Sequence, residues 1–237
     1  MKSITLFFIL FCRISIQAQS VRIHSHNDYR QARPLQEALA CNVFSIEADV
    51  FLYQNQLRVA HDEAELPNAP LLDSLYIQPL LQWFYKNTVR DSNHFPYLVI
   101  DIKSNSAVVL PALVKLLEPY PTLFNSHKMQ VVISGDRGDQ KNWDSFPGYF
   151  LFDGRPDEKY DVNTMARVGF ISNSYKNYSR QPRKKIKDLA NRVHQSGKLL
   201  RLWGIPDQPA SWKKMIAWGV DIINTDQVSA CREYFKK

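Results

Sequence analysis

The sequence predicts an α/β protein folded as a single (β/α)8 barrel. Eight short apolar runs alternate with longer stretches that have helical spacing, and 237 residues are enough for one barrel at the small end of its size range. The runs are apolar almost throughout, which is typical of parallel strands buried on both faces. A doubly wound sheet shows the same alternation, so periodicity alone leaves both arrangements open.

The expected strands are rich in Val, Ile, Leu and aromatic residues, which favour extended backbone in a buried sheet. In chain order they cover residues 21–24, 43–50, 97–102, 130–134, 149–152, 168–172, 199–203 and 220–224. After the second strand a hairpin-like return leads to His61 and Asp62.

The intervals between these strands carry the expected helices. They cover 35–40, 72–89, 107–117, 184–195 and 211–218, with weaker candidates at 139–143 and 160–165. Pro34 precedes the first helix and Pro111 lies near the first turn of the third, where proline is tolerated. Gly197 and Gly219 follow the last two helices, where helix-terminating glycines belong.

Composition excludes several classes of protein. With 45% hydrophobic and 12% aromatic residues the chain can bury a large core, which excludes intrinsic disorder for most of it. The net charge of +7 favours anionic partners. A basic run from Arg180 to Lys187 is either a solvated helix start or a contact with anionic lipid or nucleic acid. The absence of a long basic and aromatic stripe argues against nucleic acid. The oligomeric state stays open.

The first residues resemble a secretion signal rather than part of the fold. Lys2 precedes an apolar run over 4–12, and small residues follow at 17–20. Nine residues cannot span a bilayer as a helix, so we expect 1–19 to be a signal peptide and 20–237 to form the barrel of a secreted or periplasmic protein. Cys41 and Cys231 would remain, either as a pair, if the chain ends meet, or as two buried thiols.

Carboxylates gather at the carboxyl ends of the second and third expected strands. Glu47 and Asp49 lie two residues apart and therefore share one strand face, with no obvious neutralising partner in the sequence. Asp101 ends the next strand. Three converging carboxylates suit a hard divalent cation, Mg²⁺ or Ca²⁺. The alternative is a set of partly solvated acids paired with Lys103 or Arg58.

Other chemically active residues lie at the same strand ends. His26 and His61 are candidate acid and base groups, although isolated histidines are more often packed core residues, and His24 shares the face of His26. Lys103 either neutralises a phosphoryl oxygen or pairs with Glu47. Trp203 either forms an apolar wall for substrate or plugs the barrel.

These residues together resemble a known superfamily. The pattern His26-Asn27, Glu47-x-Asp49, His61-Asp62, Asp101-x-Lys103 and Trp203 resembles the glycerophosphodiester phosphodiesterase and phospholipase-C-like phosphodiesterase superfamily. Within it, segments 24–29, 47–50, 203–207 and 219–226 are similar to the altered-inheritance-of-mitochondria group of phosphatidylinositol-phospholipase-C-like proteins. The match runs from the first strand to the last.

The resemblance implies a distorted (β/α)8 TIM barrel with a Mg²⁺ or Ca²⁺ site. By position it implies His26 and His61 as the acid/base pair, Glu47, Asp49 and Asp101 as metal ligands, Lys103 as a catalytic phosphate contact and Trp203 as a wall of the substrate pocket. We also expect His24 and Asn27 to bind substrate. Asn27 stands where glycerophosphodiesterases have an arginine and resembles the sphingomyelinase D branch instead. Only 35 residues separate His61 from Tyr97, which leaves no room for the glycerophosphodiesterases' insertion.

We therefore expect a secreted metal-dependent phosphodiesterase that hydrolyses or cyclises a phospholipid or small phosphodiester. Its parts would divide the work: the cation and a lysine neutralise phosphoryl oxygens, and two histidines move protons. Alternatives are a catalytically silent barrel that binds phosphate-containing ligands, a nucleic-acid phosphodiesterase, and a metal-dependent sugar isomerase on the same barrel.

Overall fold

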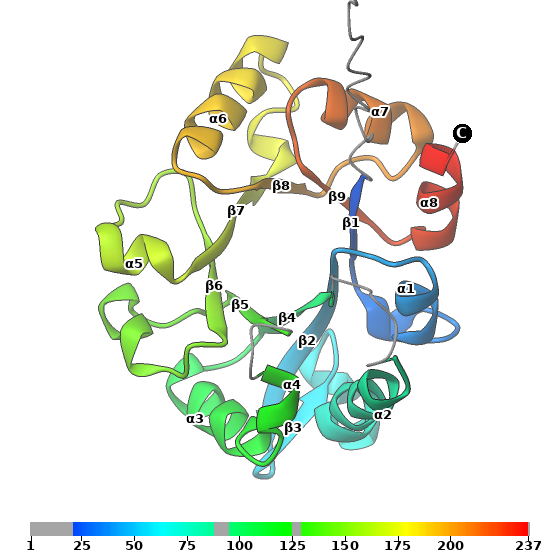
Figure 1. Cartoon of the computed structure of the whole chain (residues 1–237), viewed down its shortest axis with the longest axis vertical. Helices are drawn as coiled ribbons and strands as arrows, with labels where there is room; N and C mark the ends of the chain where they lie inside the picture. Colours follow the sequence, from blue (N-terminus) through cyan, green and yellow to red (C-terminus); the bar gives the residue numbers. More distant parts are fainter. Residues whose placement is uncertain (1–20, 88–94, 125–128, 237) are drawn as a thin grey trace, which may run out of the picture.

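The computed structural model describes residues 21–87, 95–124 and 129–236, and these form a closed barrel surrounded by helices (Figure 1). Eight strands are parallel, and pairing of the first with the second closes the ring. Closure distinguishes a (β/α)8 barrel from an open doubly wound sheet, so the predicted barrel is confirmed. The strands are β1 (Arg22–Ser25), β2 (Ser45–Tyr53), β3 (Gln56–Val59), β4 (Tyr97–Ile102), β5 (Val131–Gly135), β6 (Phe150–Gly154), β7 (Val168–Ser174), β8 (Leu200–Trp203) and β9 (Ile222–Thr225).

One strand lies outside the ring. β3 pairs antiparallel with the end of β2, and the two form the hairpin that the sequence suggested before His61. Gln54 and Asn55 make its tight turn and both have positive φ, the left-handed region in which asparagine is readily accommodated. The hairpin thus returns the chain to the barrel mouth.

The helices surround the barrel and agree with the sequence apart from short elements. They are α1 (Gln36–Ala40), α2 (Gln78–Asn87), α3 (Ser106–Leu117), α4 (Pro121–Phe124), α5 (Val162–Ala166), α6 (Arg183–Gln195), α7 (Pro209–Ala217) and α8 (Val228–Lys236). The expected helix at 139–143 is a 3-10 helix, Gln140–Ser145, and α2 is preceded by a π-helical turn, Asp73–Ile77. α4 and α8 were not predicted from the sequence. Within the described residues no helix is long and apolar enough to cross a membrane.

The barrel interior has an apolar floor and a polar mouth. Phe44, Val99, Val132, Phe170 and Ile222 form one buried cluster. Two residues further along the strands, where side chains again point inward, the chain carries polar groups instead. They are Asp101 after Val99, Ser134 after Val132, Ser172 after Phe170 and Asn224 after Ile222. The strand sequences therefore set the depth at which apolar packing stops and the site begins.

The first and last described segments of the chain meet where the barrel closes. Arg232 on α8 donates hydrogen bonds to the backbone carbonyls of Cys41 and Asn42, both at 2.8 Å, and to that of Val21 at 3.3 Å. These bonds tie the last helix to the start of the barrel (Figure 1). Cys41 and Cys231 are free thiols in this arrangement.

Packing of the barrel floor gives a stability prediction. Replacing buried Phe170 by alanine leaves a cavity, and we expect it to lower the free energy of unfolding by about 3–5 kcal/mol. Val162→Ala removes an apolar side chain that is 86% exposed and serves as the control, with an expected change within about 0.5 kcal/mol. Urea unfolding of both variants measures the difference. If Phe170→Ala lowers the free energy of unfolding as little as the control does, Phe170 does not pack in the apolar floor of the barrel.

Candidate active site

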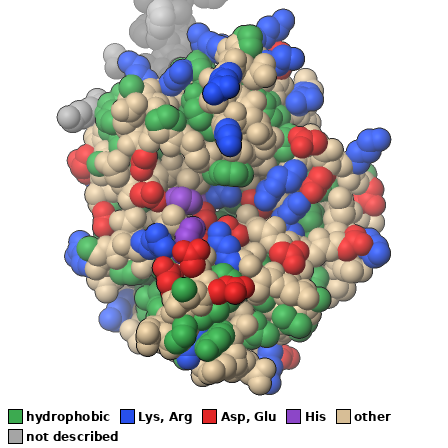
Figure 2. Space-filling model, turned by 180° about the vertical axis from the view of Figure 1, so that it is seen from behind, with side chains coloured by type: hydrophobic (Ala, Val, Ile, Leu, Met, Phe, Trp, Pro, Cys, Tyr) green, Lys and Arg blue, Asp and Glu red, His purple; other side chains and the backbone are tan. Residues whose placement is uncertain are grey.

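A cavity of about 550 Å³ opens at the carboxyl ends of the strands. On this face acidic, basic and histidine side chains gather around a hollow (Figure 2). The expected site residues that line it are His26, Asn27, Glu47, His61, Asp101, Lys103 and Trp203, and further lining residues include Ser134, Gly135, Asp136, Arg155 and Arg201. The structure thus brings most of the predicted residues into one cavity.

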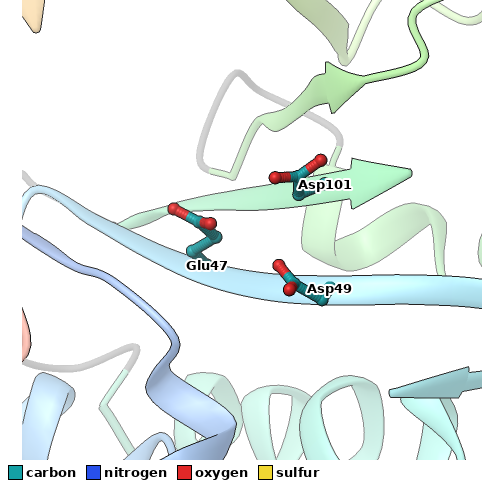
Figure 3. Close-up of side chains that lie close together, drawn as sticks. All are labelled: Glu47, Asp49 and Asp101. Carbon is teal, nitrogen blue, oxygen red and sulfur yellow. The ribbon is translucent and has the colours of Figure 1, made fainter. Parts of the chain in front are cut away.

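Three carboxylates converge on one side of this cavity (Figure 3). Glu47 and Asp49 come from β2, and Asp101 comes from β4, where it is paired in register with Asp49. One oxygen from each lies within 4.8 Å of the others. Gly135 permits this approach: its φ is +67°, and a Cβ there would lie 2.1 Å from Asp101 Oδ1. Any larger residue would displace the Asp101 carboxylate.

The two oxygens of Asp49 have different surroundings. Oδ2 accepts hydrogen bonds from the Tyr29 hydroxyl and His61 Nδ1, both at 2.9 Å, and lies 3.1 Å from Lys103 Nζ. Oδ1 is buried and has no hydrogen-bond partner within the described part of the chain. A buried carboxylate oxygen without a partner is costly, so this atom is suited to an additional ligand such as a cation.

The charges of the triad also favour a cation. Burial raises the pKa of Asp101, as do the neighbouring charges of Glu47 and Asp49, and Lys103 opposes the rise only in part. The three carboxylates therefore repel one another, and a hard divalent cation with oxygen ligands would relieve that repulsion. Because an unpartnered oxygen and mutual repulsion occur at the same place, the donor set fits Mg²⁺ or Ca²⁺.

Lys103 bridges two members of the triad. Its Nζ lies 3.0 Å from Asp101 Oδ2 and 3.1 Å from Asp49 Oδ2. Burial lowers the pKa of Lys103, but the two carboxylates outweigh this effect and raise it, so the side chain carries a positive charge. It pairs with these residues rather than with Glu47. Arg58, the other expected partner, donates instead to the carbonyls of Leu66 and Ala69.

Glu47 has a neutralising partner that the sequence analysis missed. Arg201 on β8 places Nη1 3.3 Å from Glu47 Oε2 and 2.7 Å from His24 Nε2, and its Nη2 lies 3.2 Å from Asp153 Oδ2. Burial opposes ionisation of Glu47, yet the contacts with His24 and Arg201 hold its pKa well below the usual range. The sequence carried one signal for this role: Arg201 is a charged residue at an inward position of an apolar strand, two residues before Trp203.

His24 lies beneath the cavity rather than in it. Its side chain has no exposed surface, Nδ1 lies 2.8 Å from Ser45 Oγ, and Nε2 contacts Glu47. Burial and the charge of Arg201 lower the pKa of His24 to about 4, so the ring is neutral near pH 7. The expectation that His24 contacts substrate is therefore corrected: it sits two residues deeper along β1 than His26 and supports Glu47.

His26 is oriented by a carboxylate from the opposite end of the chain. Its Nδ1 donates to Asp226 Oδ1 at 2.7 Å, which leaves Nε2 for a ligand. Burial lowers the pKa of His26, but the hydrogen bond to Asp226 and the charge of Glu47 outweigh it, and the net shift is upward. His61 has the same arrangement, since its Nδ1 donates to Asp49.

Asp226 is itself fixed by a neighbouring loop. Asp207, which follows β8, accepts hydrogen bonds from the backbone N–H of Asp226 at 2.8 Å, the Thr225 hydroxyl at 2.6 Å and Trp212 Nε1 at 2.8 Å. Asp226 directly follows β9, so its place at a strand end was the signal that could have identified it.

Asn27 and Trp203 complete the rim of the cavity. Asn27 has a φ of 46°, a left-handed conformation that asparagine tolerates, and its Nδ2 lies 3.2 Å from His26 Nδ1. Trp203 is 43% exposed at the end of β8. It is therefore a wall of the mouth, whereas the apolar cluster containing Phe170 plugs the barrel.

Family models match two parts of the chain. The model described as AIM6-like phosphodiesterase domain matches residues 12–130, and that of the glycerophosphoryl diester phosphodiesterase family matches 200–228. The Altered inheritance of mitochondria protein 6 homolog of Arthroderma benhamiae is 26% identical over 91% of this chain and 84% of its own length. Altered inheritance of mitochondria protein 6 of Eremothecium gossypii is also 26% identical, over 90% of this chain and 69% of its own length.

Solved structures share the fold. A glycerophosphodiester phosphodiesterase from Parabacteroides distasonis gives a TM-score of 0.60 at 16% identity and covers 92% of this chain and 97% of its own. A phosphodiesterase from Oleispira antarctica, solved in complex with the product sn-glycerol-3-phosphate, gives 0.56 at 13% identity, covering 91% and 97%. At these identities the likeness establishes the barrel alone.

The Asp226–His26 pair gives a prediction about pH dependence. Asp226→Asn removes the charge that raises the pKa of His26, so the limb of the pH–rate profile set by His26 should move toward lower pH. The rate should fall about 100-fold or more, because the ring loses its orienting carboxylate. Asp221→Asn, which alters an Asp–His pair with His194 outside the cavity, is the matched control. An unchanged profile in Asp226→Asn would show that Asp226 does not orient the reacting histidine.

Proposed function

The chain belongs to the AIM6-like phosphodiesterase family, and from this premise we propose that it is an exported, divalent-metal-dependent enzyme acting on phospholipids or related small phosphodiesters. The family matches make it a phosphoric diester hydrolase. Metal dependence is supported above all by one observation, the buried and unpartnered Oδ1 of Asp49 beside Glu47 and Asp101. Mg²⁺ is the first candidate and Ca²⁺ the second.

The cavity residues divide the work of phosphodiester cleavage. Glu47, Asp49 and Asp101 would hold the cation, which when bound neutralises charge on the phosphoryl oxygens. Lys103 lies at the same edge of the cavity and offers a positively charged donor to a phosphoryl oxygen. Trp203 covers one side of the bound substrate.

Two histidines move the protons. His61 takes a proton from the attacking hydroxyl as its oxygen bonds to phosphorus, and His26 gives a proton to the leaving oxygen as that phosphorus–oxygen bond breaks. We assign the donor role to His26 because its raised pKa enlarges the protonated fraction near neutral pH. Asp226 and Asp49 each hold one of the two rings through its Nδ1, so that Nε2 is the reacting atom of both.

Replacement of a triad carboxylate tests the metal site. Asp101→Asn removes one ligand and also one of three mutually repelling charges, so activity should fall about 10²–10³-fold while the metal-free protein is no less stable. Thermal unfolding with and without Mg²⁺ or Ca²⁺ should show a metal-dependent rise in Tm for the wild type that Asp101→Asn lacks. Asp157→Asn, an exposed control, should retain that rise. Wild-type turnover in the presence of chelator would overturn metal dependence.

The nucleophile is predicted to be a hydroxyl of the substrate when one neighbours the phosphodiester. Holding that hydroxyl in line makes the attack effectively unimolecular, and the first product is then a cyclic phosphate. Phosphorus NMR at early times should detect it, and His26→Asn and His61→Asn should each lower the rate by about 10²–10⁴-fold. If linear phosphomonoester alone appears at the earliest times, direct attack by water is the mechanism.

Export is proposed from residues that lie outside the described part of the chain. The predicted signal peptide, 1–19, precedes the start of β1 at Arg22, so the mature chain should begin near Ser20 or Val21. Mass spectrometry of the protein in its native compartment measures this, and a functional form that retains Met1 would contradict it. Contact of the basic segment 180–187, whose arginines and lysines are exposed, with an anionic bilayer also stays a prediction, which vesicle flotation measures.

A further inference from the structure

The active-site cavity has two sides of different chemistry. β1, β2 and β4 and the loops after them contribute histidines, carboxylates and Lys103. β8 contributes Arg201 and Trp203, and the loop after β6 contributes Arg155. In the ring β9 separates β1 from β8, and β5 separates β4 from β6. Arg201 reaches back to Glu47 of the triad, so Arg155 is the guanidinium that lies across the cavity from the triad and the catalytic histidines.

Arg155 is anchored through a single nitrogen. Its Nη1 donates to the backbone carbonyls of Asp153 and Gly154, both at 3.1 Å, and lies 2.8 Å from Asp153 Oδ2. Within the described part of the chain neither Nε nor Nη2 makes a hydrogen bond, and 27% of the side chain is exposed. The guanidinium thus keeps one edge with two parallel N–H donors, which matches a carboxylate or phosphate in a bidentate geometry.

The Asp153 carboxylate, which holds Arg155, has its hydrogen-bond acceptor sites occupied. Asp153 is fully buried and accepts hydrogen bonds from the Ser134 hydroxyl at 2.8 Å and from the Ser172 hydroxyl. The same carboxylate also pairs with Arg201 Nη2 at 3.2 Å. Because Asp153 and two carbonyls fix the guanidinium in advance, a ligand that binds its free edge pays little further ordering cost.

We propose that Arg155 binds a second anionic group of the substrate, a phosphomonoester or carboxylate carried by the head group whose phosphodiester is cleaved. This inference rests on the proposed function and names its substrate class. The triad and Lys103 occupy the side where the scissile phosphate is handled, so the facing donors are left for the head group. A cationic head group such as choline would meet the Arg155 guanidinium there and is disfavoured.

Matched substrates test this subsite. We compare kcat/KM for glycerophosphoinositol 4-phosphate with that for glycerophosphoinositol, which lacks the second phosphate, and expect a preference of about ten-fold or more for the former. Arg155→Met should reduce that ratio to about one, chiefly through KM. Equal values in the wild type overturn the proposal. A ratio unchanged by Arg155→Met also overturns it, because another residue would then recognise the second phosphate.

Two controls test whether the substrate preference comes from Arg155 and from the head group. Arg33→Met removes an exposed arginine that does not line the cavity and should keep the ratio. Phosphatidylinositol 4-phosphate and phosphatidylinositol in mixed micelles form a second matched pair. If both the water-soluble and the lipid pair show a preference that depends on Arg155, Arg155 recognises the head group alone. If only the lipid pair shows that preference, Arg155 recognises the head group only when it is carried by a lipid.

A binding measurement keeps the inference testable apart from turnover. Calorimetry with inositol 1,4-bisphosphate and inositol 1-phosphate should give about ten-fold tighter binding of the bisphosphate to the wild type and no such difference in Arg155→Met. That result supports the subsite even if no substrate is hydrolysed, in which case the proposed function alone fails. Equal affinities in the wild type overturn the subsite whatever the activity.

Discussion

Burial of four carboxylates in one barrel mouth is the constraint on which the site depends. Glu47, Asp49 and Asp153 are buried, and Asp101 lies beside them. An ionised carboxylate in a protein interior is costly unless it is paired and hydrogen-bonded. Arg201 spans Glu47 and Asp153, and Lys103 spans Asp49 and Asp101. Among the fully buried oxygens of these four carboxylates, Asp49 Oδ1 alone lacks a hydrogen-bond partner in the described part of the chain, and it lies where the triad converges.

Most of the fold follows from local patterns in the sequence. Apolar runs predicted all eight barrel strands because strands buried on both faces need apolar residues at nearly every position. The strand pattern alone could not establish closure, which the family resemblance implied, since closure depends on pairing of His24 with Ser45 between strands that no local signal connects. The last helix was missed because its buried face is narrow, with Val228 and Cys231 as its fully buried residues.

The candidate site was likewise predicted only in part from the sequence. Spacing on one strand placed Glu47 and Asp49 together, and the order of strands brought Asp101 to them. Spacing along β1 did not predict how deeply His24 is buried. Because its side chain lies below the cavity, its ring supports Glu47. Arg201 and Asp226 were missed as partners because their contacts join segments far apart in the sequence. Arg201 reaches across the barrel from β8 to β2, and Asp226 follows β9, which pairs with β1 next to His26. Pairings of this kind depend on barrel geometry and not on sequence spacing.

The central claim is that the triad binds a divalent cation, and crystals soaked in Mn²⁺ test it most directly. Mn²⁺ takes the same oxygen ligands as Mg²⁺ and is located by its anomalous scattering. We predict one strong anomalous peak at about 2.0–2.3 Å from oxygens of Glu47, Asp49 and Asp101, with Asp49 Oδ1 among its ligands. A map without a peak in this cavity, with Lys103 still bridging Asp49 and Asp101 at saturating Mn²⁺, would contradict the claim.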